Sequence, residues 1–153
     1  MTPEVERFID LARGFCALLE TATEREPATL RSELLEILPG LYVAGSRLPL
    51  PDVDADVPTS SLQLDVLVPL SKYLGGNDRF WEIFDPTQSE KPIEGSLSLE
   101  LSEIRFDLQQ GLVALERGAP LDAVVWEWRW GLENHWGNHL VNALRVIHWQ
   151  RAW

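Results

Sequence analysis

Apolar residues recur at helical spacing along the first quarter of the chain. The apolar positions from Val5 to Ala22 fall three or four residues apart and predict a helix over residues 3–25. Thr2-Pro3 is a favourable start, because threonine can cap the first backbone N–H groups and proline suits the first helical position. This stretch therefore predicts an amphipathic helix with one face in a core.

A second helix is predicted to begin at Pro27, and its apolar positions continue to Tyr42. Pro39 lies inside this pattern, so we expect it to kink or break the helix. Residues 49–60 hold three prolines and three aspartates and predict a loop.

The middle of the chain predicts short elements. Residues 61–75 fit a helix that Pro69 interrupts. Residues 79–84 fit a short helical turn, capped by the Asn77-Asp78 pair that precedes it, and residues 86–95 are a polar loop.

A regular helix follows. Ser96 or Ser98 caps it, and it runs to about Glu116 before Gly118 ends it. Its inner stripe consists of leucine and isoleucine at helical spacing: Leu97, Leu101, Ile104, Leu108, Leu112 and Leu115.

The last thirty residues combine two patterns. Val124–Trp130 alternates like a strand, but the alternation is lost after Trp130, and residues 121–150 fit a single long helix better. This helix is apolar on two sides, which is typical of a central helix in a bundle. The whole pattern predicts an all-α, single-domain bundle over residues 1–153. It has about five to seven helices, with the long C-terminal helix at its centre.

The net charge of −11 is unevenly distributed. Residues 1–120 hold ten lysines and arginines against 21 acidic residues, whereas residues 121–153 hold three of each and six of the seven tryptophans. An acidic chain is repelled by phosphate backbones, so we expect no nucleic-acid partner. No apolar run is long enough to span a bilayer, so we expect no membrane partner.

The chain begins without a basic segment followed by an apolar stretch, so we expect no secretory signal and a cytoplasmic protein. Cys16 is the single cysteine, which excludes an intramolecular disulfide. Its apolar neighbours predict a packed thiol, not a reactive one.

Several motifs are distinctive. Trp126–Arg129, Glu133–His139 and Ala143–His148 follow one another near the C-terminus, and Phe80–Pro86 stands in mid-chain. Two further motifs are Ile37–Tyr42 and Ile104–Leu112. Together they resemble a bacterial family catalogued as a domain of unknown function, number five-zero-six-three. Phe106 is a minor departure from its pattern. The resemblance covers most of the chain and implies a helical fold, but it implies no activity.

His135 and His139 are the candidates for metal binding. They are four residues apart, so on a helix both imidazoles project from one face and can chelate a metal. A third ligand would come from the preceding helix, from Glu100, Glu103 or Asp107. The glutamate that metalloproteases carry after the first histidine is missing, and no Glu-x-x-His motif occurs. Two partly buried, structural histidines are the alternative, and we expect no resident metal or cofactor.

The tryptophans of residues 121–150 fit either a core or a contact surface, because aromatic residues and arginine are favoured in both. Asn142 and Arg145 belong to a polar stripe between the two apolar faces. We therefore expect a non-catalytic interaction module that docks a protein partner or a second copy. The alternative is a metal- or small-ligand-binding protein centred on the two histidines. The candidate binding residues are Trp126, Trp128, Arg129, His135, Trp136, His139, Asn142 and Arg145.

Other motifs are weaker. Asp52–Asp56 imitates the start of a calcium loop, but Val57 stands at the sixth position, which requires glycine, and Gln63 stands at the twelfth, which requires glutamate. Gly75-Gly76 fits a helix terminus and not a phosphate-binding loop.

Overall fold

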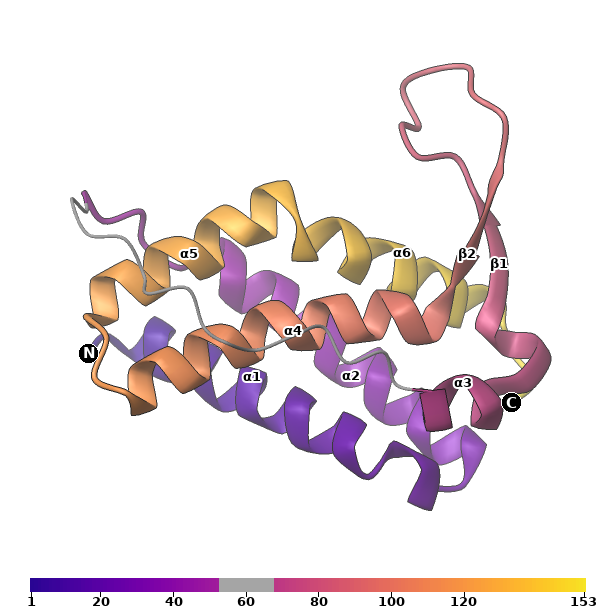
Figure 1. Ribbon diagram of the computed structural model, residues 1–153, viewed down its shortest axis with the longest axis horizontal. Helices are drawn as coiled ribbons and strands as arrows, with labels where there is room; N and C mark the ends of the chain where they lie inside the picture. The colour runs from indigo at the N-terminus through magenta and orange to yellow at the C-terminus, as the bar shows by residue number, and fades with distance from the viewer. Residues whose placement is uncertain (53–67) are drawn as a thin grey trace.

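The computed structural model describes residues 1–52 and 68–153. The described chain forms six α-helices and a two-stranded sheet, which confirms the all-α prediction. The helices are α1 (Pro3–Glu20), α2 (Pro27–Ser46), α3 (Val68–Leu74), α4 (Leu97–Glu116), α5 (Leu121–Asn134) and α6 (Trp136–Trp149). Four rods, α1, α2, α4 and the consecutive pair α5–α6, run along the long axis of the molecule (Figure 1). Among the described residues, no helix combines the length and apolarity needed to cross a bilayer.

The helix starts follow the predicted capping. The Thr2 side chain accepts a hydrogen bond from the Val5 backbone N–H, and the Ser96 side chain accepts one from Leu99. The helix predicted over residues 3–25 ends at Glu20, and a short 3-10 turn, Ala22–Glu24, follows it. Pro39 lies inside α2 without ending it. Most of the predicted loop over residues 49–60, the start of the predicted 61–75 helix and the calcium-like motif after Asp52 lie outside the described residues.

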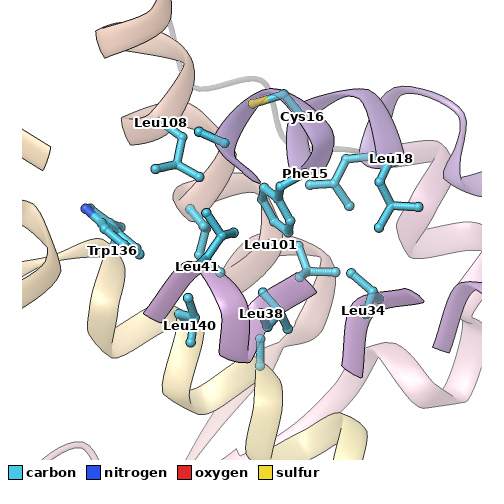
Figure 2. Packing of buried hydrophobic residues seen from close by; sticks show 14 of the residues in the cluster. Phe15, Cys16, Leu18, Leu34, Leu38, Leu41, Leu101, Leu108, Trp136 and Leu140 are labelled. Atoms are coloured by element: carbon cyan, nitrogen blue, oxygen red, sulfur yellow. The ribbon is translucent and has the colours of Figure 1, made fainter. Parts of the chain in front are cut away.

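Leucines and aromatic residues from every rod fill the core. Figure 2 shows Phe15 of α1, Leu38 of α2, Leu101 of α4 and Leu140 of α6 converging at its centre. Each of these side chains is essentially inaccessible to solvent. Two arginines close helix ends across the bundle: Arg31 donates to carbonyls at the C-terminal end of α6 and Arg129 to those of α2.

The prediction of a single helix over residues 121–150 is wrong, because the chain breaks at His135. That residue has non-helical angles (φ −144°, ψ −89°) and separates α5 from α6. Trp136 turns back toward α5 and donates its ring N–H to the Trp128 carbonyl at 2.9 Å. A Cβ on Gly137 would lie 1.9 Å from the Leu132 carbonyl oxygen, so this close approach requires glycine.

The predictions of a helical turn over residues 79–84 and of a loop over 86–95 are also wrong in part. Strand β1 (Arg79–Glu82) pairs antiparallel with β2 (Ile93–Ser96), so that Phe80 lies opposite Gly95. The Phe80 ring covers Gly95 so closely that a Cβ there would lie 2.5 Å from it. The hairpin projects beyond the helical rods, near the C-terminal end of α6 (Figure 1).

Buried Asp78 anchors the hairpin to α4. Its carboxylate accepts hydrogen bonds from the Ser71 and Ser96 hydroxyls and from the Ser98 backbone N–H. A carboxylate at a helix N-terminus is favourable, because it neutralises unpaired N–H groups and the helix dipole. This anchor fixes β1 beside the first turns of α4, which carry the acidic residues of the candidate site.

Candidate functional site

Acidic residues line one side of α4. Glu100, Glu103 and Asp107 follow one another at spacings of three and four residues, which places them along one face of the helix. This face lies beside the leucine stripe that packs in the core, so the three carboxylates sit at the edge of the interface with α6. We call them, together with His135 and His139, the carboxylate–histidine cluster.

Each histidine pairs through Nδ1 with a different carboxylate of α4. His135 Nδ1 lies 2.7 Å from Asp107 Oδ2, and His139 Nδ1 lies 2.8 Å from Glu100 Oε2. Glu100 is buried, with 6% of its surface exposed, so its carboxylate requires a hydrogen-bond partner such as this imidazole. The two imidazole rings meet edge to face, with ring centroids 5.0 Å apart.

Glu103 lies between the two pairs. Its Oε2 is 3.8 Å from His135 Nε2, which is longer than a hydrogen bond. One ligand atom each of Glu103, His135 and His139 lies within 4.8 Å of the other two. A tetrahedral zinc ion with bonds of about 2.0–2.2 Å separates its ligand atoms by about 3.3–3.6 Å. Side-chain adjustments of about 1 Å would therefore bring these three atoms around one ion.

The carboxylate–histidine cluster extends toward the hairpin through Glu82 of β1. Glu82 Oε2 accepts a hydrogen bond from the Asn142 side-chain amide at 2.5 Å. Asn142 lies one helical turn beyond His139, so the hairpin touches the same face of α6 as His139. Sequence reasoning missed Glu82, because residues 79–84 were predicted as a helical turn.

The local charges shift two protonation equilibria. Burial raises the pKa of Glu82, and the nearby Glu100 charge adds to this rise, whereas Arg145 and His139 oppose it. The hydrogen bond with Glu100 raises the pKa of His139, although burial opposes the change. The negative charges of Glu100, Glu103 and Asp107 act on His139 in the same direction as that hydrogen bond.

Six of the eight predicted binding residues separate into three groups. Trp128 and Trp136, at 1% and 0% exposure, are core residues that a partner cannot reach. Arg129 is engaged within the fold, where it donates to the Ser46 carbonyl and pairs with Glu133. His135 and His139 belong to the carboxylate–histidine cluster, and Asn142 lies beside it.

The other tryptophans are more accessible. Trp126 stacks on Trp130 of the same helix, with centroids 6.2 Å apart, and Trp130 is 46% exposed. Trp149, at 74% exposure, stands at the end of α6, where it and Arg145 line a hollow against β1. The predicted tryptophan-rich segment is therefore core on one side and surface on the other.

The chain belongs to the family described as Domain of unknown function (DUF5063), whose model matches residues 1–152. This confirms the resemblance seen in the sequence motifs. The structure is similar to the crystal structure of protein BF1032 from Bacteroides fragilis, a target of the Northeast Structural Genomics Consortium. The two share 25% identity and a TM-score of 0.82 over 99% of this chain and 94% of that one. No curated protein matches the chain. Neither name states an activity.

Proposed function

We propose that this member of the family binds a divalent transition-metal ion through Glu103, His135 and His139. The observation that carries the proposal is the pairing of both Nδ1 atoms with carboxylates. Each pairing fixes the ring and leaves Nε2 as the free ligand atom, and His135 Nε2 faces Glu103. Metal-bound histidines usually donate their other ring N–H to a carboxylate in this way.

The ligand set favours zinc or a similar borderline ion. Two imidazole nitrogens and one carboxylate oxygen suit zinc, whereas magnesium and calcium prefer oxygen ligands alone. Three protein ligands leave a fourth position for water or another ligand. The His135 side chain is 44% exposed, so this position would be open to solvent.

The negative charge of the carboxylate–histidine cluster also supports the binding of a cation. Glu100, Glu103 and Asp107 bring three carboxylates to one face, and Glu82 adds a fourth at the hairpin end. Two histidines compensate this charge only when protonated, and a metal ion would replace their protons with a larger positive charge. The purely structural alternative treats the histidine–carboxylate pairs as links between α4 and α6. It gives Glu103 no role, because within the described part of the chain its carboxylate forms no hydrogen bond and lies 3.8 Å from His135 Nε2.

Zinc titration tests the proposal. We expect the purified, metal-free protein to bind one zinc ion per chain in calorimetry and in competition with a chromophoric chelator. Glu103→Gln should weaken binding by at least about tenfold, because the amide keeps the shape but loses the charge. The double variant His135→Ala/His139→Ala should abolish binding.

His148→Ala is the matched control, since His148 lies on α6 but is exposed and outside the carboxylate–histidine cluster. It should bind zinc as the unchanged protein does. Absence of stoichiometric zinc binding, or an equal loss in His148→Ala, would contradict the metal site.

A second candidate is the interaction module expected from the sequence, now restricted to the surface of α5. The stacked Trp126–Trp130 pair supports it, because Trp130 exposes nearly half its surface. Light scattering over a range of concentrations tests self-association through this surface. A mass that stays at one chain, unchanged in Trp130→Ser, would count against a second copy as the partner.

A further inference from the structure

A hollow of about 250 Å³ lies between the hairpin and the C-terminal end of α6. Its walls are Phe80 and Trp81 of β1, Arg145, Val146 and Trp149 of α6, and Gln150. Ligand sites for drug-sized molecules typically occupy about 300–1,000 Å³, so this hollow suits a smaller molecule or one end of a larger one.

Two tryptophans on the walls are unusually exposed. Trp81 and Trp149 expose 67% and 74% of their surfaces, although both are large apolar side chains. Phe80, by contrast, is nearly buried, and its ring packs over Gly95. Rigid aromatic walls around a concave site favour a planar or alkyl group, which would remove their apolar surface from water.

Arg145 gives the hollow its charge. No hydrogen bond or ion pair joins its guanidinium to another described residue, and Glu82 acts on it only at longer range. Two other arginines lie in this part of the chain. Arg129 donates to the Ser46 carbonyl of α2, and Arg151, which follows α6, does not line the hollow. An arginine with free donors beside apolar walls favours an anionic group, above all a carboxylate, which it can bind through two N–H groups.

We propose that this hollow binds a small organic anion: a carboxylate attached to an aromatic or alkyl body. The apolar body lies against the aromatic walls, and the carboxylate accepts hydrogen bonds from Arg145. The site is separate from the proposed metal ligands, and it does not depend on them.

Ligand-observed NMR with 3-phenylpropionate tests the proposal. We expect saturable binding that is five- to tenfold tighter than that of its neutral amide, because only the acid pairs with Arg145. Propionate, which lacks the apolar body, should bind at least tenfold more weakly than 3-phenylpropionate. Arg145→Gln should remove the preference for the acid over the amide, whereas Trp149→Ala should weaken both.

Matched controls separate a local effect from a general one. Arg151→Gln removes an exposed arginine near the hollow, and Trp130→Ala removes an exposed tryptophan on another helix, so both should bind the acid normally. The variant His135→Ala/His139→Ala should also bind it, whatever the result of the zinc titration. Equal binding of acid and amide, or an equal loss in Trp130→Ala, would overturn the proposal. Concentration-dependent dimerisation that Trp149→Ala abolishes, without probe binding, would assign the surface to a second copy and overturn it too.

Discussion

The two histidines pair with different acids, although their ring centroids are only 5.0 Å apart. Asp107 holds His135, and the more deeply buried Glu100 holds His139. Neither acid is among the three proposed metal ligands, so at the proposed zinc site each acid would act indirectly. It would fix the ring and strengthen Nε2 as a ligand.

We therefore expect Asp107→Asn and Glu100→Gln each to weaken zinc binding by about 10- to 100-fold without changing the stoichiometry of one ion. Chelator competition measures the affinity. Glu116→Gln is the control, because Glu116 is exposed at the far end of the same helix. This variant should bind zinc as the unchanged protein does. A tenfold loss in the control would show that the effect is one of overall charge.

The single thiol is a second residue whose environment fixes its chemistry. Burial raises the pKa of Cys16 from 9.0 to about 11, and the nearby Arg105 opposes this only partly. At pH 8 the thiolate fraction is thus about a hundredfold smaller than that of a free cysteine. We expect iodoacetamide to label the folded protein at least a hundredfold more slowly than the protein unfolded in urea, as followed by mass spectrometry. Similar rates in both states would contradict a packed thiol.

At this scale, the residues of the proposed metal site could be predicted from the sequence. The acids of α4 follow a local helical pattern, and the four-residue spacing of the histidines indicated that they lie close together, although His135 itself is not helical. Which acid holds which histidine could not be predicted, because that depends on the register between α4 and α6. Glu82 was invisible for a similar reason: its place beside Asn142 follows from a hairpin that pairs residues far apart in the chain.

Among the elements, the break between α5 and α6 decides where the histidines point. A continuous helix would satisfy the same apolar pattern, so periodicity alone favoured it. The break depends instead on the buried Trp136 ring and on the backbone approach of Leu132 to Gly137. Contacts of this kind are tertiary, and the sequence shows them only as a glycine that a helix does not require.

Gly137→Ala should therefore destabilise the protein by at least about 2 kcal/mol, because a methyl group there meets backbone that cannot move without reshaping the break. Gly14→Ala is the matched control in α1, where a new methyl group would make only an ordinary contact of 3.6 Å with Ile37. It should stabilise the protein by about 0.5–1 kcal/mol through its higher helix propensity. Urea unfolding measures both changes, and a Gly137→Ala variant as stable as the unchanged protein would contradict the close approach.

The hairpin was missed for a different reason, since a helical turn was predicted where the structure has strand β1. Arg79–Glu82 is too short to show a period, and its turn-forming neighbours fit a helical cap equally well. Gly95 is the residue that reveals the strand pair, because the Phe80 ring can cover only a glycine. Pairing over such a distance makes an element that local reasoning cannot assign.

For the whole molecule, the net charge of −11 and the carboxylates of the carboxylate–histidine cluster both add to the electrostatic repulsion in the folded state. Like charges brought together by folding destabilise the compact state, and the four carboxylates near the histidines concentrate that cost at the α4–α6 interface. A bound cation would remove part of this cost and would also link the two helices.

Zinc should consequently raise the thermal stability of the protein. A ligand that binds only the folded state at a hundred times its dissociation constant stabilises it by about 2.7 kcal/mol. For a chain of this length that corresponds to an increase in the melting temperature of about 5–11 °C, measurable by circular dichroism. Magnesium at the same concentration should have a much smaller effect, since it screens charge but binds imidazole poorly. Glu103→Gln, which is expected to bind zinc at least about tenfold more weakly, should lose about half of the response to zinc or more and keep the response to magnesium. An equal rise in melting temperature with both ions would mean that general neutralisation of the acidic surface, and not coordination by the carboxylate–histidine cluster, stabilises the fold.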